Sequence, residues 1–175
     1  MSDSVVIWII SAVPVFWAVG AYNRLVRLRA QAIAAFAPLD AQFGHYVALV
    51  KNGFASFHGD DGPAARAGLV GAALQLETSL KEARAQPLDV LAMQALETAH
   101  EALCASWARV RNEPPDLAGA SLPEALQLQW EHIAFDVGTA GVEFNCRVQD
   151  YNAAIRQFPA GLLARLFGFG PAHEL

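Results

Sequence analysis

The spacing of hydrophobic residues predicts α-helices along most of the chain. Apolar residues recur at steps of three and four, and the sustained apolar–polar alternation that would indicate strands does not occur. The longest pattern runs from Leu122 to Phe158, where ten steps over thirty-six positions average 3.6 residues, the period of an α-helix. The predicted fold is therefore all-α, with an N-terminal transmembrane helix that continues into an antiparallel up-and-down bundle of long helices.

Turn-forming residues separate four predicted helices. Residues 59–63 end the first helix, Pro87 ends the second, and residues 112–115 end the third. The fourth helix is predicted to begin at a capping box, Ser121 to Glu124. The predicted buried stripes are Tyr22, Val26, Ile33, Phe36, Leu39, Phe43, Val47, Val50, Phe54 and Phe57; Leu69, Ala73, Leu76, Leu80 and Ala83; Leu88, Leu91, Ala95, Ala99, Leu103, Ser106 or Trp107, and Val110; and Leu122, Leu126, Trp130, Ile133, Val137, Ala140, Phe144, Val148, Tyr151, Ile155 and Phe158.

Prolines and glycines predict local features of these helices. Pro14 predicts a kink and Pro38 a bend in the first helix, because a proline lacks an amide donor. Gly138 and Gly141 lie beside the stripe of the fourth helix and predict the close approach of another helix.

A charge-free stretch near the N-terminus is long enough to cross a bilayer. No side chain between Ser4 and Tyr22 is charged, and nineteen residues at 1.5 Å rise make about 28 Å, close to the ~30 Å hydrocarbon core. Trp8 and Trp17 lie near its two ends, as in an aromatic belt. Residues 1–22 are therefore predicted to be a single-pass membrane anchor, residues 23–158 a helical bundle, and residues 159–175 a short apolar tail.

Arginines set the predicted orientation of the anchor. Arg24, Arg27 and Arg29 follow the span, whereas the residues before it lack lysine and arginine. Because positive residues are retained on the cytoplasmic side, the N-terminus is predicted outside a cell membrane and the bulk of the chain in the cytoplasm. The same arginines are placed to meet anionic headgroups. A cleaved signal peptide, with small residues at 18–20, and a buried core helix are the alternatives.

Composition excludes several classes of protein. The hydrophobic fraction is 54%, the charged fraction is 17% and the net charge is −5, so the chain is more apolar than an ordinary soluble domain and is acidic. Its sequence has no basic stripe for a nucleic-acid partner, and so apolar a chain folds rather than remaining disordered. Two cysteines, Cys104 and Cys146, are too few for a disulfide framework.

The C-terminal tail has two predicted roles. Four antiparallel helices return the chain to the end at which the first helix leaves the membrane, so the tail is expected near the bilayer. Its apolar residues Leu163, Leu166, Phe167 and Phe169 suit a short interfacial helix. The alternative is that the tail caps the open end of the bundle core.

Three asparagines inside predicted helices are the polar residues with the best claim to a role. Asparagine is a mediocre helix former, so its placement indicates side-chain hydrogen bonds. Asn23, Asn145 and Asn152, with Tyr22 and Tyr151, are therefore predicted to form a polar network between helices or at the membrane-proximal end. Such a network either fixes helix register or forms a ligand site.

Candidate catalytic groups are few. Glu97 and His100 form one Glu-x-x-His pair, whereas a di-iron bundle needs two, and Cys104 replaces the second histidine of a zinc-protease motif. Cys104 lies one helical turn from His100, as a histidine-activated thiol would, but its neighbours Leu103 and Trp107 are typical of a buried structural thiol. We therefore predict a non-enzymatic protein with no catalytic residue, metal ligand or cofactor.

Two stretches of the sequence resemble the LemA family. The segment from Tyr22 to Arg29, directly after the predicted span, resembles the start of that family. The C-terminal signature comprises Phe144-Asn145, Asp150-Tyr151-Asn152, Phe158-Pro159, Ala164 and Phe167-Gly168-Phe169. With matching length and helical order, the resemblance covers nearly the whole chain.

The resemblance implies an N-terminally anchored protein with a cytoplasmic bundle of long antiparallel helices. Members of that family have no agreed enzymatic activity, and one branch takes part in magnetosome membrane formation. The first helix departs from the family pattern, because His45-Tyr46 and residues 48–52 replace a basic pair and an Asp-Leu-Ile-Pro-Asn-type stretch, of which only Asn52 remains. The chain therefore resembles a divergent member.

These observations predict a membrane-anchored scaffold or membrane-organising protein. The alternative is a membrane-tethered sensor or regulator that docks a partner protein on the bundle surface. The predicted partners are membrane lipid and, beyond it, either further copies of the chain or a different protein, but no nucleic acid.

Overall fold

The computed structural model is all-helical, as predicted. It describes residues 2–54, 64–112, 122–158 and 160–175, with side chains described from Val15 onward. The helices are α1 (Ser2–Gly53), α2 (Ala64–Ala85), α3 (Val90–Arg111), α5 (Glu124–Arg156) and α6 (Ala160–Leu166). The predicted turn at residues 59–63 and the capping residue Ser121 lie outside the described residues.

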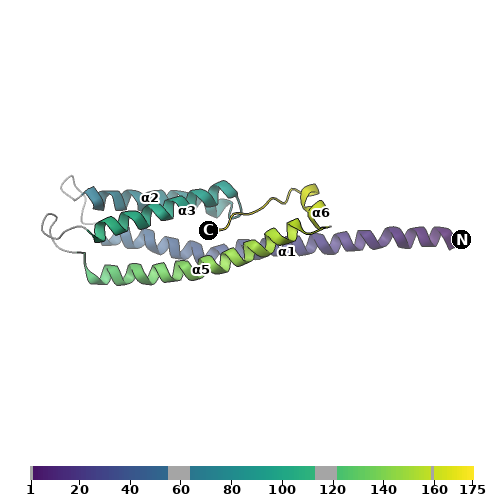
Figure 1. Cartoon of the computed structure of the whole chain (residues 1–175), viewed down its shortest axis with the longest axis horizontal. Helices are drawn as coiled ribbons and strands as arrows, with labels where there is room; N and C mark the ends of the chain where they lie inside the picture. Colours follow the sequence, from purple (N-terminus) through teal and green to yellow (C-terminus); the bar gives the residue numbers. More distant parts are fainter. Residues whose placement is uncertain (1, 55–63, 113–121, 159) are drawn as a thin grey trace.

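Helix α1 is the element that reaches beyond the rest of the molecule. It is helical throughout, including Pro14 and Pro38, and its N-terminal part projects alone past the bundle (Figure 1). Among the described residues it is the one helix long and apolar enough to cross a membrane, with a mean hydropathy of 1.2 in the range Val15–Gly53. This helix therefore supports a possible single membrane anchor near the N-terminus.

The four long helices form an antiparallel ring that is not closed on one side. Helix α1 packs between α2 and α5, and α2 packs against α3. The described residues of α3 and α5 bring no pair of Cα atoms within 8 Å. Two tryptophan side chains, Trp107 and Trp130, and the C-terminal residues bridge the space between α3 and α5.

Most of the predicted core stripes are buried. In α2 all five predicted residues are buried, and in α1 the prediction holds from Phe36 to Phe54. Nearer the predicted span the assignment was wrong by one position, because Leu25 and Ala32 are buried while Val26 and Ile33 are exposed. Three further residues of the predicted stripes are exposed: Tyr22, Leu91 and Phe158. Six others are partly buried: Leu88, Ala95, Leu122, Leu126, Ala140 and Ile155.

The helix starts are described for α3 and α5. Helix α5 begins at Glu124 with Pro123 before it, and the capping box stays a prediction because Ser121 lies outside the described residues. Helix α3 is capped by Asp89, whose carboxylate accepts a hydrogen bond from the amide of Ala92 at 2.9 Å.

Close helix approach occurs at a different glycine from those predicted. A Cβ atom on Gly138 or Gly141 would meet no atom within 4 Å outside its own helix, so the prediction for these residues was wrong. A Cβ atom on Gly53 would lie 3.1 Å from the Leu126 side chain. The end of α1 and the start of α5 therefore meet at Gly53, because glycine leaves room for Leu126.

Candidate functional site

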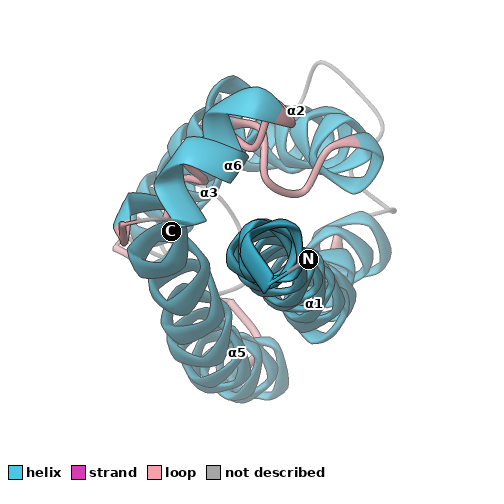
Figure 2. Cartoon of the chain, turned by 90° about the vertical axis from the view of Figure 1, so that its right-hand side faces the viewer, coloured by secondary structure: helices cyan, strands magenta, loops and turns pink. Residues whose placement is uncertain are grey.

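Helix α6 lies against α1 directly after the predicted span. Ala164 of α6, Leu25 of α1 and Ala154 of α5 form a small buried cluster that is separate from the main core. In both overall views α6 is at the end of the bundle from which the N-terminal part of α1 projects (Figures 1 and 2). Since α6 follows α5 after a short turn, the antiparallel topology brings it to this end.

A glycine reverses the chain after α6. The amide of Phe169 donates to the carbonyl of Ala164 at 2.8 Å, and Gly168 has a φ of 73°. This is the Schellman arrangement, in which glycine in the left-handed region ends a helix at little steric cost. The chain then leaves α6 and runs back along the bundle, so the predicted tail consists of two parts with different surroundings.

The surface around α6 combines exposed apolar residues with arginines. Phe158 is 82% exposed, Leu162 61%, Leu166 76% and Phe167 55%. The Tyr22 ring packs against the Phe167 ring with a centroid separation of 4.9 Å. We call this surface the collar; its residues are Tyr22, Phe158, Leu162, Leu166 and Phe167 with the exposed arginines Arg24, Arg27, Arg29, Arg156 and Arg165.

The structure places the four tail residues predicted to face a membrane in different surroundings. Leu166 and Phe167 are exposed, as an interfacial position requires. Leu163 and Phe169 are only partly exposed, and Phe169 packs against both hydrophobic clusters. Leu162, which lies outside the predicted set, is also exposed.

Residues 170–175, the tail segment, lie in the space between α3 and α5, which we call the tail groove. The Asn152 side chain contacts the main chain of Ala172 twice: its Nδ2 donates to the carbonyl at 2.9 Å, and its Oδ1 accepts from the amide at 2.9 Å. Both residues are buried. The primary amide thus pairs with the tail segment as a neighbouring peptide would.

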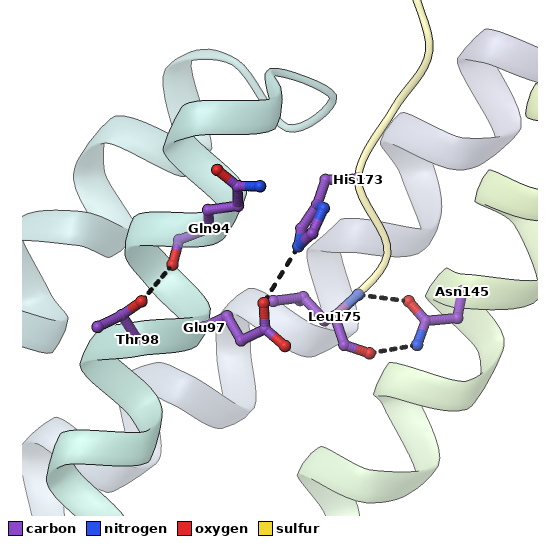
Figure 3. Close-up of polar contacts among 6 residues, drawn as sticks. All are labelled: Gln94, Glu97, Thr98, Asn145, His173 and Leu175. Atoms are coloured by element: carbon purple, nitrogen blue, oxygen red, sulfur yellow. Dashed lines mark hydrogen bonds and ion pairs between the residues drawn. The ribbon is translucent and has the colours of Figure 1, made fainter.

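Asn145 repeats this contact two helical turns earlier in α5. Its Oδ1 accepts from the amide of Leu175 at 2.8 Å, and its Nδ2 donates to the main-chain oxygen of the same residue (Figure 3). Seven residues of helix span about 10.5 Å, and three residues of extended chain span about 10 Å. The spacing of Asn145 and Asn152 therefore matches the spacing of Ala172 and Leu175.

Three further hydrogen bonds hold the tail segment. The Tyr151 hydroxyl donates to the carbonyl of Gly170 at 2.9 Å. His173 Nε2 lies 3.1 Å from a Glu97 carboxylate oxygen on α3, and Gln149 Nε2 donates to Glu174 at 2.7 Å. Figure 3 shows that Glu97 and Asn145 approach the segment from opposite sides. The tail segment consequently bridges two helices that do not contact each other through their backbones.

An aromatic stack bridges the other half of the space between α3 and α5. The Trp107 and Trp130 rings are stacked with a centroid separation of 4.2 Å and an interplanar angle of 4°. Tyr46 of α1 packs on Trp130 with a centroid separation of 4.4 Å. Both tryptophans and Tyr46 are buried, so large side chains here replace direct contact between the helices.

The predicted polar network is present in part and has a different partner. Asn145, Tyr151 and Asn152 bind the main chain of the tail segment rather than another helix. Tyr22 takes part in aromatic packing with Phe167 and Phe169. Asn23 is exposed, and the described hydrogen bonds do not include its side chain.

His100 and Cys104 lie together, as their spacing predicts, in a setting that disfavours a thiolate. Cys104 Sγ is 3.4 Å from His100 Nε2, and the His100 ring packs against Phe43 and Tyr46. Burial raises the pKa of the Cys104 thiol and lowers the pKa of His100. A neutral thiol beside a neutral imidazole is the state these shifts favour, which is not an activated nucleophile.

The lowered pKa of His100 predicts a loss of stability in mild acid. The unfolded chain binds a proton near pH 6.5, whereas burial makes the folded chain resist it, so the free energy of unfolding should fall as the pH falls below about 6.5. We expect His100→Gln to reduce the decrease in melting temperature between pH 7.5 and 5.5. His132→Gln, at an exposed position, is the control; an equal effect of both substitutions would contradict this assignment.

The two cysteines should differ sharply in reactivity. Cys146 is exposed, whereas Cys104 is partly buried and its pKa is raised. Because the thiolate is the reacting species, we expect iodoacetamide at pH 7.5 to modify Cys146 at least ~10-fold faster than Cys104 in the folded protein. Mass spectrometry of peptides over time measures both rates, and similar rates in the folded state would contradict the burial of Cys104.

Glu97 and His100 do not form part of a metal-binding cluster in the described parts of the chain. Their side chains contact His173 and Cys104, respectively. Among residues 2–54, 64–112, 122–158 and 160–175, no group of three or more His, Cys, Asp or Glu residues is placed to hold a metal ion.

Fold and site together define an antiparallel helical bundle with a long apolar N-terminal helix and a C-terminal segment bound in the bundle. The family model described as "LemA family" matches residues 70–175, more than half of the chain. The chain therefore belongs to the LemA family. The match includes the C-terminal signature and begins within α2, downstream of the first-helix stretch that departs from the family pattern. Comparison with curated proteins and with solved structures gives no match.

Proposed function

We propose that this protein is a non-enzymatic scaffold that α1 anchors in a membrane and the collar seats on the membrane surface. The observation that carries the proposal is the position of α6 against α1, next to the apolar part of α1 that projects from the bundle. Exposed Leu166 and Phe167 beside arginines are what an interfacial segment presents to lipid headgroups and acyl chains.

The charges and the topology of the collar support this arrangement. Apolar side chains bury favourably at the acyl boundary, and each arginine near an anionic surface contributes on the order of 1 kcal/mol. The collar arginines flank the exposed apolar residues on α1, α5 and α6. Because both α1 and the collar attach to the membrane, the long axis of the bundle is fixed and points away from the membrane surface.

The proposed orientation places the N-terminus outside and the bundle in the cytoplasm. It rests on Arg24, Arg27 and Arg29, which follow the span without counterparts before it. A membrane-impermeant maleimide added to intact cells should then leave Cys146 unmodified until the membrane is opened. Modification in intact cells would reverse the proposed orientation.

An environment-sensitive fluorophore on a single cysteine tests whether the collar meets the membrane. The full chain with Cys104→Ala and Cys146→Ser receives a cysteine at Leu166 in the collar or at Leu128 near the far end of α5, both exposed. In liposomes that contain anionic lipid, we expect a blue-shifted emission and quenching by lipid-borne quenchers at position 166 only. Emission typical of water at both positions would contradict the proposal.

A further inference from the structure

The tail groove recognises features that every copy of the chain carries. Asn145 and Asn152 each pair with both the amide and the main-chain oxygen of one tail residue, and Tyr151 donates to the carbonyl of Gly170. Glu97 adds one side-chain contact, to His173. The groove is thus a binding site for a short extended segment with this sequence, whichever copy supplies it.

The connection between α6 and the tail segment is suited to release of the segment. Phe167 is 55% exposed, Gly168 is exposed, and residues 167–171 line a cavity of about 820 Å³ between α1, the α2–α3 turn and Tyr151. Helix α6 is held separately by Ala164. The tail segment can therefore leave the groove by rotation about the glycines while every helix stays packed.

From these contacts we propose that the tail groove also binds the tail segment of a second copy, so that neighbouring copies exchange segments. The inference rests on the proposed function, because a shared membrane anchor gives all copies the same direction. A two-fold axis along the membrane normal then brings a neighbour's segment into the groove with the same polarity as the chain's own. Because residues 170–175 occupy the groove, the link to α6 consists of residues 167–169, which extend to about 10 Å. Exchange therefore requires α6 of one copy to lie next to the tail groove of the other.

The exchange gives the scaffold a means of self-assembly that adds no new kind of contact. Each exchanged segment makes the hydrogen bonds that it makes within one chain, so the equilibrium depends mainly on the density of copies in the membrane. Confinement to a surface raises that density relative to solution. Dilute copies should hold their own segments, and crowded copies should exchange them.

Cross-linking between two tagged chains tests the exchange. Gln149 and Glu174, whose side chains lie 2.7 Å apart, mark the groove and the segment. In the full chain with Cys104→Ala and Cys146→Ser, one tagged copy carries Gln149→Cys and the other Glu174→Cys, and both are reconstituted in the same liposomes. After addition of a short bis-maleimide, we expect a covalent dimer that carries both tags.

Matched controls separate exchange from collision and misfolding. A chain that carries both Gln149→Cys and Glu174→Cys should give an internally cross-linked monomer, which shows that the groove is intact. Asp150→Cys, exposed at the same level of α5 as Gln149, replaces Gln149→Cys as the collision control. Asn145→Ala with Asn152→Ala in the acceptor copy should reduce the dimer at least about fivefold.

Two results bear differently on the inference and on the proposed function. A dimer no more abundant than the Asp150→Cys control, with normal internal cross-linking in the double variant, would overturn the exchange. The collar fluorescence at position 166 is measured on single chains and is unaffected by that outcome. A collar that does not meet the membrane would instead remove the proposed seating of the scaffold.

Discussion

Replacing Asn152 by alanine should destabilise the protein by about 3 kcal/mol and lower its melting temperature by about 6–12 °C. The substitution leaves the amide and the carbonyl of Ala172 without partners in a buried position. A buried polar group without a partner costs ~1–3 kcal/mol, and release of the tail segment limits the total because water then solvates it. Thermal unfolding of the full chain in mild detergent measures the change.

Asn23→Ala is the matched control for this prediction. Asn23 also lies inside a helix, but its side chain is exposed, so both substitutions gain the same helix propensity and only one loses the contact with Ala172. Carboxypeptidase digestion adds a local measurement, since a released tail segment should be shortened faster in Asn152→Ala. Equal melting temperatures and digestion rates in the two variants would show that Asn152 does not hold the segment.

The helices were predictable from the sequence because one face of each is buried against protein. In α2, Leu76 lies between Gln75 and Glu77, and Leu80 lies between Ser79 and Lys81, so the period of the buried residues is unambiguous there. In the first part of α1, both Leu25 and Val26 are apolar, but only Leu25 packs against Ala164 of α6, while Val26 is exposed. The apolar pattern does not indicate which of the two faces α6 covers, so the predicted stripe included Val26 instead of Leu25.

The candidate site was predictable on one side only. Asn145 and Asn152 stand out because asparagine is unfavourable inside a helix without a hydrogen-bond partner. Their partner is the main chain of residues 172 and 175. Every residue has the same main-chain amide and oxygen, so the sequence does not show which residues these asparagines bind. Likewise nothing in the sequence joins Glu97 to His173. Gly168 was the available signal, because a glycine directly after an apolar helical turn is typical of a Schellman end and a chain reversal.

Trp130→Ala should produce the largest loss of stability in the bundle, about 3–5 kcal/mol. Trp130 is 6% exposed, stacks on Trp107 and contacts Tyr46, so its removal leaves a cavity lined by two aromatic rings. Elsewhere a cavity between packed helices can shrink as the helices move together. Here α3 and α5 make no backbone contact, and the tryptophans bridge the space that separates them, so the cavity should persist and its full cost should appear.

Phe135→Ala on the same helix isolates this effect from the loss of an aromatic residue as such. Phe135 is 73% exposed, so its replacement should change the free energy of unfolding by less than about 0.5 kcal/mol. Trp130→Phe should fall between the two, because a smaller ring keeps part of the contact with Trp107. If the aromatic stack joins α3 to α5, urea denaturation should show the largest loss of stability for Trp130→Ala, a smaller loss for Trp130→Phe and the smallest for Phe135→Ala. A Trp130→Ala midpoint equal to that of Phe135→Ala would mean that the tail segment alone holds the two helices together.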